Sequence, residues 1–164
     1  MKNLTRRKFL GMMTTAGAAS SVLGWPLISQ AGKAEGRVVI VGGGFGGASC
    51  ARYLKRMAPG LDVTLVDRDR KFITCPFSNA VLGGLYDLDY ITHDYDTLRS
   101  SHGVNVVHDS VTGIDPGAKT VGLAGGTKLP YDRLVISPGI DIKWGAVGGY
   151  DMAASQAMPH AWKA

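Results

Sequence analysis

Three glycines and one acidic residue form the pattern with the clearest chemical meaning in this sequence. Gly42, Gly44 and Gly47 have the spacing G-x-G-x-x-G, and Asp67 follows at the distance of about 20 residues that a dinucleotide fingerprint requires. Glycines let backbone N–H groups approach a pyrophosphate, and a carboxylate accepts hydrogen bonds from ribose hydroxyls. The pattern predicts a binding site for an adenine dinucleotide, and the simpler alternative is a glycine-rich surface turn.

The neighbouring residues extend this predicted site and restrict the cofactor. Phe45 and Gly46 belong to the same glycine-rich loop and are expected to lie against the cofactor. Arg68 follows the acidic residue and would suit a 2′-phosphate, but the carboxylate of Asp67 would repel such a group. We therefore expect a cofactor without a 2′-phosphate, which disfavours NADP.

A cysteine follows in the segment Lys71–Asn79. Pro76 lacks an N–H group and favours an extended conformation at Cys75, so the segment is predicted to be irregular and not helical. It comes soon after the predicted ribose-binding acid, at the edge of the sheet where open α/β folds bind ligands. The thiol is a candidate redox nucleophile or covalent tether. A packed loop residue is the alternative, because reactivity needs a lowered thiol pKa.

The other polar side chains indicate neither a metal site nor a catalytic residue. The two cysteines and four histidines have no metal-ligand spacing. Cys50 falls on the apolar side of a predicted helix and is interpreted as a small buried hydrophobe. Four aspartates are interpreted as solvent-exposed residues and not as acid and base groups: Asp87, Asp89, Asp94 and Asp96.

A predicted strand, helix and second strand position the fingerprint. The apolar run Val38–Val41 suits a strand that is buried on both faces of a parallel sheet. An amphipathic helix is predicted over Gly47–Met57, and Val63–Val66 forms the next strand. The phosphates of the cofactor would then lie at the positive end of this helix.

The following residues are predicted to continue the same domain. Ala80–Ser101 is expected to be a loop followed by a short helix near Tyr95–Ser101, and Val104–His108 is expected to be another parallel strand. Turn residues separate three short strands of a small antiparallel meander: Val111–Ile114, Thr120–Leu123 and Thr127–Leu129.

A final strand completes the predicted site. Tyr131–Gly139 has the pattern of a buried strand that ends in small residues, so the backbone of Ser137, Pro138 and Gly139 is expected close to the same ligand. The backbone near Val111 is expected beside the adenine. The predicted fold is α/β and Rossmann-like, with a parallel sheet and a small antiparallel β-meander.

The beginning of the chain differs from the rest. Met1–Ala34 has a basic start, an apolar middle and a small-x-small cleavage candidate, which together predict an export signal. Arg6-Arg7 matches the twin-arginine pattern, with an ordinary secretory signal as the alternative. Polar residues and glycines interrupt the apolar run, so no stable membrane span is expected. From Glu35 onward 13 basic residues balance the 13 acidic ones, so the charge predicts no nucleic-acid partner.

Two segments resemble a known family of flavoproteins. The sequence Y-D-R-L-V-I-S-P-G at Tyr131–Gly139 is similar to the strand that returns to the flavin in two-dinucleotide-binding-domain flavoproteins. The sequence F-I-T-C-P-F-S-N-A-V-L-G-G at Phe72–Gly84, together with the twin-arginine pattern, resembles the flavoprotein subunit of flavocytochrome c sulfide dehydrogenase. The resemblance covers residues 35–164 and implies that they form a domain that binds FAD.

The same resemblance implies a role for the whole protein. It implies FAD attached covalently through Cys75, sulfide as the substrate, and a c-type cytochrome subunit as the partner that accepts electrons. It also implies a periplasmic location and a role in sulfur oxidation. The redox cysteine pair of the family has no counterpart here, because no cysteine follows Cys75.

Family members are far longer, so the chain is expected to be a fragment or truncated reading frame without the second domain, inactive by itself. Other functions stay open at this point. They are a sulfide:quinone reductase, an NAD(P)H-dependent FAD oxidoreductase, and a catalytically inert dinucleotide-binding fragment.

Overall fold

The computed structural model describes residues 36–158, which belong to one compact unit, Lys33–Ala164. The predicted export signal, Met1–Ala34, lies outside the described residues. The fold is therefore reported for the predicted cofactor-binding domain alone.

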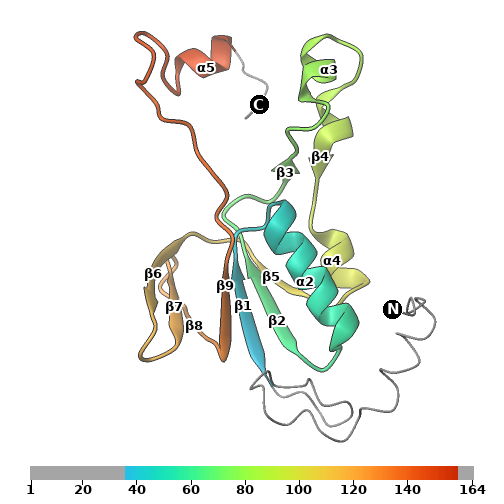
Figure 1. Cartoon of the computed structure of the whole chain (residues 1–164), viewed down its shortest axis with the longest axis vertical. Helices are drawn as coiled ribbons and strands as arrows, with labels where there is room; N and C mark the ends of the chain where they lie inside the picture. Colours follow the sequence, from blue (N-terminus) through green and yellow to red (C-terminus); the bar gives the residue numbers. More distant parts are fainter. Residues whose placement is uncertain (1–35, 159–164) are drawn as a thin grey trace, which may run out of the picture. The chain divides into compact units, whose positions relative to one another are not determined.

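A parallel sheet of four strands forms the centre of the described residues (Figure 1). In order of pairing the strands are β5 (Asn105–Val107), β2 (Asp62–Val66), β1 (Arg37–Val41) and β9 (Arg133–Ile136). All three pairings are parallel, and β1 pairs with β2 on one side and with β9 on the other. The chain crosses β1 to add its last strand, which creates a switch point in strand order, and ligands of such sheets bind there.

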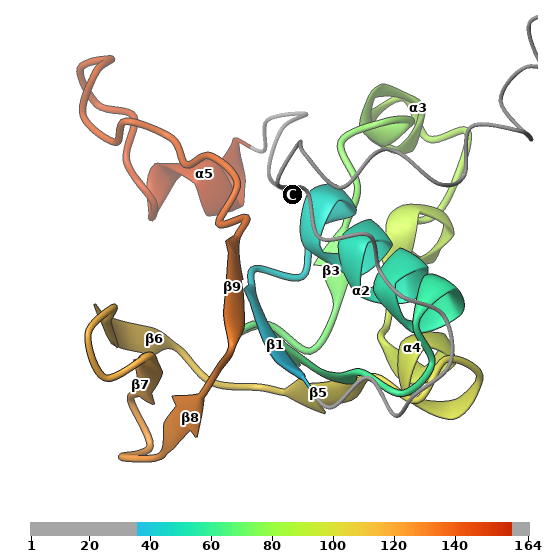
Figure 2. The same ribbon diagram turned by 60° about the horizontal axis from the view of Figure 1, so that its bottom comes forward.

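Helix α2 (Phe45–Met57) covers one face of this sheet (Figures 1 and 2). Its buried Ala51 packs with Val38 and Ile40 of β1 and with residues of β2. The helix begins earlier than the predicted start at Gly47, because the extended backbone of Gly44 caps it and Phe45 is already helical. Otherwise the predicted strand, helix and strand are confirmed, and they form because an apolar helix stripe faces strands that are buried on both sides.

An antiparallel meander packs against the opposite face. It consists of β6 (Val111–Asp115), β7 (Thr120–Leu123) and β8 (Lys128–Pro130), joined by turns as predicted. The buried side chains of Val121, Leu123 and Tyr131 form a second apolar cluster with Val39 and Val66 of the sheet. Alternate residues of β1 therefore point to two different cores, one under the helix and one under the meander.

Between β2 and β5 the chain forms a narrow extension beyond the sheet edge (Figure 1). The short strands β3 (Phe72–Ile73) and β4 (Thr92–His93) pair in antiparallel fashion at its base. Beyond them lie helix α3 (Ser78–Leu82) and the 3-10 helix η1 (Leu88–Ile91), and α4 (Asp96–Ser100) follows next to α2.

The sequence predicted some features of the segment between β2 and β5 correctly and one incorrectly. The short helix before the third parallel strand is confirmed, and the four aspartates are exposed as predicted. The loop prediction is wrong where α3 forms, because the effect of Pro76 on the preceding residue does not prevent a helix from starting after it. The hydroxyl of Ser78 donates to the Cys75 carbonyl (2.6 Å), which stabilises the turn into α3.

The described chain ends in an irregular segment after β9, with one short helix, α5 (Ala154–Ala157). Within residues 36–158, the helices are too short or too polar to cross a lipid bilayer.

Candidate functional site

A cleft of about 1180 Å³ opens where β1, β2 and β9 end. Its walls come from the loop after β1, the loop after β2, the base of the extension, the start of β6 and the segment after β9. Eleven of the twelve residues predicted to bind the cofactor line it: Gly42, Gly44, Phe45, Gly46, Asp67, Arg68, Cys75, Val111, Ser137, Pro138 and Gly139. The structure thus brings together residues from five separate parts of the sequence.

Gly42 lies where the ends of β1, β2 and β9 meet. Its backbone has φ +97°, a conformation that residues with side chains rarely adopt, and a Cβ atom here would collide with the Ser137 carbonyl oxygen. Its N–H group donates to the Val66 carbonyl at 2.8 Å. The missing side chain therefore lets the end of β9 lie directly against the glycine loop.

The N-terminus of α2 faces the cleft. Gly44 caps the helix without a side-chain hydrogen bond, and the first turn contains no acidic residue. Phe45 and Gly46, the first residues of the helix, line the cleft and are exposed. An uncapped first turn leaves N–H donors and the positive end of the helix dipole for an anion such as a pyrophosphate.

Gly47 is the predicted site residue that does not line the cleft. It is buried, and a Cβ atom at this position would collide with the carbonyl oxygen of Gly42. The third glycine of the fingerprint therefore allows close packing of α2 on β1, and its relation to the cofactor is indirect.

The Asp67 carboxylate binds the backbone of the glycine loop. One carboxylate oxygen accepts a hydrogen bond from the Gly43 N–H (2.5 Å), and the other accepts one from the Asp69 N–H (2.8 Å). Its own N–H donates to the Val107 carbonyl at 3.0 Å. Each carboxylate oxygen keeps a further lone pair, which is the acceptor that a ribose hydroxyl needs.

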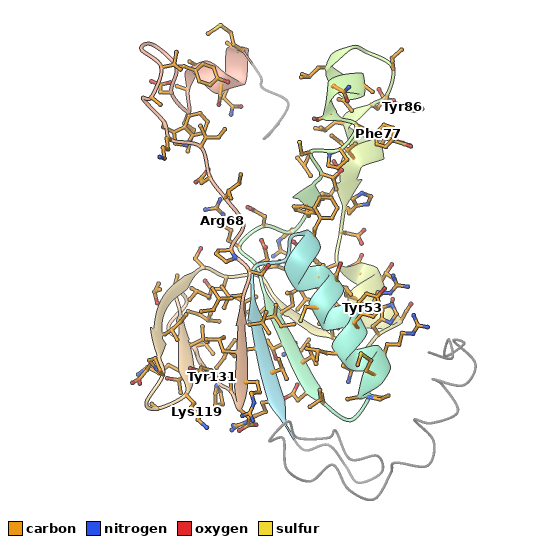
Figure 3. The ribbon with its side chains drawn as sticks, viewed as in Figure 1. Tyr53, Arg68, Phe77, Tyr86, Lys119 and Tyr131 are labelled. Carbon is orange, nitrogen blue, oxygen red and sulfur yellow. The ribbon has the colours of Figure 1, made fainter. Side chains whose placement is uncertain are left out.

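Basic side chains border the same part of the cleft. Arg68 is exposed, and its guanidinium lies 3.3 Å from a carboxylate oxygen of Asp69. Arg70 and Lys71 also line the cleft, although the sequence did not single them out. Figure 3 shows Arg68 where the ends of the strands meet the extension. These cations offset the aspartates around them and suit a ligand with phosphate groups.

Cys75 lies at the base of the extension and is partly buried. It is a free thiol, and its carbonyl accepts hydrogen bonds from both the N–H and the hydroxyl of Ser78. The rings of Phe45 and Phe72 line the same cleft and meet edge to face, with centroids 5.2 Å apart. The thiol thus sits on a short, fixed segment within the cleft.

The other cysteine has a different environment. Cys50 is on α2, partly buried, and packs against the apolar cluster under the helix. This confirms its interpretation as a packing residue. The two thiols form no disulfide.

Tyr95 is a residue of the cleft that sequence reasoning missed. It is 3% exposed, belongs to the apolar cluster under α2, and lines the cleft. Burial, followed by the carboxylates of Asp67 and Asp69, raises its pKa above the ordinary value of a phenol. The sequence placed it only at the start of a short helix, because nothing local indicates a contact with the distant glycine loop.

No group of three or more His, Cys, Asp or Glu residues that could hold a metal ion occurs between Gly36 and Met158. The groups at the cleft that could bind a ligand are backbone N–H groups, carboxylates and cations.

Comparisons with known proteins agree with this geometry. The family model for pyridine nucleotide-disulphide oxidoreductases matches residues 36–152. The chain belongs to this family. The matched range contains the parallel sheet, the meander and every residue of the predicted site. The predicted α/β fold is confirmed, and so is the prediction that the chain belongs to a family of FAD-binding oxidoreductases.

Relatives within this pyridine nucleotide-disulphide oxidoreductase family include proteins of sulfide oxidation. The chain is 64% identical over 45 residues to the flavoprotein chain of a flavocytochrome c sulfide dehydrogenase from Chlorobaculum thiosulfatiphilum, which covers 27% of this chain and 94% of that sequence. It is 30% identical over 118 residues to a sulfide-quinone reductase from Aquifex aeolicus, covering 72% of this chain and 27% of the relative. The resemblance identified from the sequence is thereby confirmed.

A solved structure supports the same relationship. The sulfide:quinone oxidoreductase of Aquifex aeolicus superposes with a TM-score of 0.65 and 31% identity over 70% of this chain and 27% of that chain. This chain spans about a quarter of the length of the Aquifex aeolicus protein, whereas the Chlorobaculum sequence is short.

Proposed function

We propose that residues 35–164 form the FAD-binding domain of an exported sulfide dehydrogenase flavoprotein. The observation that carries the proposal is the cleft at the strand ends, which combines the glycine loop, the Asp67 carboxylate and the Cys75 thiol. The similarity to the flavoprotein chain of a sulfide dehydrogenase supports sulfide as the substrate.

In this proposal each part of the cleft has one task. The first turn of α2 and the backbone of Gly42 and Gly44 bind the pyrophosphate, and Asp67 binds the adenosine ribose. The backbone of Ser137 to Gly139 lies along the inner edge of the flavin, and the start of β6 at Val111 lies near the adenine. The fit rests on the close backbone approach at Gly42 and on the uncapped helix N-terminus.

Bound FAD would supply an acceptor for two electrons that releases them one at a time. The overall reaction oxidises HS⁻ to zero-valent sulfur with loss of one proton and two electrons. The two electrons reduce two ferric haem centres of a c-type cytochrome. In this proposal, the residues that line the cleft bind and orient the cofactor.

Covalent attachment through Cys75 is part of the proposal, supported by the position of this thiol in the cleft wall. The test is to produce the protein together with its export machinery, precipitate it with acid, and measure flavin absorbance in the pellet and supernatant. We expect the flavin to stay with the wild type and to be released from Cys75→Ser.

Cys50→Ser is the matched control, because this thiol packs against the core away from the predicted flavin. It should retain the flavin as the wild type does. Complete release of flavin from the acid-treated wild type would contradict the tether, although it would leave non-covalent FAD binding possible.

A quinone as electron acceptor is the second candidate, favoured by the similarity to sulfide-quinone reductases. The two are distinguished by supplying sulfide to the full-length protein with either oxidised cytochrome c or decylubiquinone and following the reduction of each. Faster reduction of the cytochrome supports the dehydrogenase, and faster reduction of the quinone supports the alternative. NADH oxidation in the same assay would favour an NAD(P)H-dependent flavoenzyme.

Location in the periplasm is a further part of the proposal, supported by the pair Arg6-Arg7 in a basic start. Replacing both arginines by lysine keeps the charge but removes the pattern that the twin-arginine receptor recognises. We expect the wild type in the periplasmic fraction and the variant in the cytoplasm. Unchanged export of the variant would indicate an ordinary secretory signal.

A further inference from the structure

The Tyr95 side chain is in an unusual position for a residue of an apolar core. It stands at the N-terminal cap of α4 and is 3% exposed. Its ring packs among the apolar side chains under α2, with the His108 ring at a centroid distance of 5.7 Å. Its polar end lies against the backbone of the glycine loop.

The hydroxyl of Tyr95 is buried and has no hydrogen-bond partner among residues 36–158. It faces Gly43, where a Cβ atom would collide with the phenol oxygen. Buried hydroxyl groups are nearly always hydrogen-bonded, so an unpaired one next to a ligand cleft calls for an explanation.

The Asp67 carboxylate is the acceptor best suited to the Tyr95 hydroxyl. The Gly43 N–H that lies against the phenol donates to Asp67 at 2.5 Å, so phenol, amide and carboxylate form one compact cluster. After burial, the negative charge of Asp67 is the next cause that raises the Tyr95 pKa, so the carboxylate acts on the phenol directly. A neutral phenol is a donor, and the bond to Asp67 needs a small movement of the Tyr95 side chain that brings its oxygen into hydrogen-bond geometry with the carboxylate.

We propose that Tyr95 is a positioning residue for recognition of the nucleotide ribose. Its O–H donates to the Asp67 carboxylate and holds the remaining lone pairs of that group toward the ribose hydroxyls. The inference rests on the proposed function, in which Asp67 binds the ribose of an adenine nucleotide. Tyr95 acts through Asp67 and does not contact the ligand, since its hydroxyl lies behind the glycine loop.

The test measures binding of ADP, 2′-deoxy-ADP and 3′-deoxy-ADP to the full 164-residue chain by calorimetry, for the wild type and for Tyr95→Phe. Phenylalanine keeps the ring in the core, so the variant should fold. We expect about tenfold weaker ADP binding by the variant, because one hydrogen bond to a charged group is lost. For the deoxy nucleotide that lacks the recognised hydroxyl, Tyr95→Phe should weaken binding much less than it weakens ADP binding.

This dependence on the ribose distinguishes positioning from packing. A purely structural role would weaken all three nucleotides equally and would overturn the inference, as would unchanged ADP binding by the variant. Tyr131→Phe is the matched control, because Tyr131 is also buried but belongs to the cluster under the meander (Figure 3). It should bind all three nucleotides like the wild type.

A second measurement does not depend on ligand. Melting temperatures of the wild type, Tyr95→Phe, Asp67→Asn and the double variant form a cycle, and we expect the two substitutions to be clearly non-additive. Additive effects would overturn the inference. A wild type that binds no ADP would contradict the proposed function, while the melting cycle would still decide whether Tyr95 and Asp67 interact.

Discussion

Individual residues of the glycine loop have different physical tasks. Gly42 allows a backbone conformation and an approach of β9, Gly44 caps α2 without a side chain, and Gly47 allows the helix to pack on the strand. Gly43 is not part of the fingerprint, yet it connects Asp67 and Tyr95. The end of β9, Asp67 and Tyr95 therefore restrain the loop before any ligand is bound. This restraint reduces the entropy that is lost on binding.

Replacing Gly42 by alanine is predicted to be the most damaging single substitution in the loop. The positive φ and the collision with the Ser137 carbonyl both oppose a side chain, so we expect a loss of roughly 3 kcal/mol or more in the free energy of unfolding. Urea unfolding followed by circular dichroism measures it. Gly84→Ala is the control, because its φ is +72° but nothing lies within 4 Å, and it should cost only about 1 to 2 kcal/mol.

Among the elements, β1 determines how the site is built, because it pairs on both sides and contributes to both apolar clusters. Its neighbour β2 ends directly before Asp67, and β9 ends directly before Ser137. The parallel register places these strand ends at the same edge. The position of the cleft is thus a consequence of strand order.

The central strands should be sensitive to loss of apolar volume. Leu65 of β2 has 0% exposure, so Leu65→Ala is expected to lower the free energy of unfolding by about 2 to 5 kcal/mol through lost burial and a cavity. Leu85→Ala is the matched control, because Leu85 is 76% exposed and its truncation should change stability by less than about 0.5 kcal/mol. Equal losses in urea unfolding would contradict the assignment of the core.

An ion pair joins the beginnings of two strands. The Arg37 guanidinium at the start of β1 donates two hydrogen bonds to the Asp132 carboxylate just before β9, at 3.2 and 3.1 Å. These bonds lower the pKa of Asp132 to about 2, from an ordinary value of 3.8. The group therefore favours the folded state above pH 3.8, and this contribution is lost as the pH falls through about 2.

The corresponding prediction concerns melting temperature as a function of pH. The wild type should melt above Asp132→Asn at neutral pH, and the difference should shrink as the pH decreases from about 4 to about 2. The difference should be small throughout because both side chains are exposed. Arg37→Gln removes the guanidinium but keeps the backbone N–H that also donates to the Asp132 carboxylate at 2.8 Å, so it should reduce the pH dependence of this difference. A constant difference in the wild-type background would contradict the prediction.

At the scale of the whole molecule, both apolar clusters are made of residues from β1 onward within the described part of the chain. The described residues all fall in the compact unit Lys33–Ala164. We therefore expect this unit to fold without the predicted export signal.

The test compares the complete chain with one that begins at Lys33. We expect both to unfold cooperatively with melting temperatures within about 2 °C, because the same cores are present. A loss of the cooperative transition in the shorter chain would show that the first residues contribute to the core, and the proposed division of the chain would be wrong.

The sequence alone determined the strand, helix and strand around Gly42, the meander and the strand before Ser137, because hydrophobic period, glycine spacing and turn residues are local properties. Sequence reasoning missed α3 after Pro76 and placed the start of α2 too late. Helix ends depend on one or two backbone conformations that composition does not specify.

Only the tertiary structure decided which distant residues share the cleft. Strand order brings the ends of β1, β2 and β9 together, and it buries Tyr95 beside Gly43 and Asp67 although no local pattern connects them. The tertiary structure also shows that Gly47 serves the packing of α2 on β1, whereas Gly42 and Gly44 line the cleft. Contacts of this kind depend on how the chain crosses the sheet, and they arise from burial of two apolar faces and not from the spacing of residues along one segment.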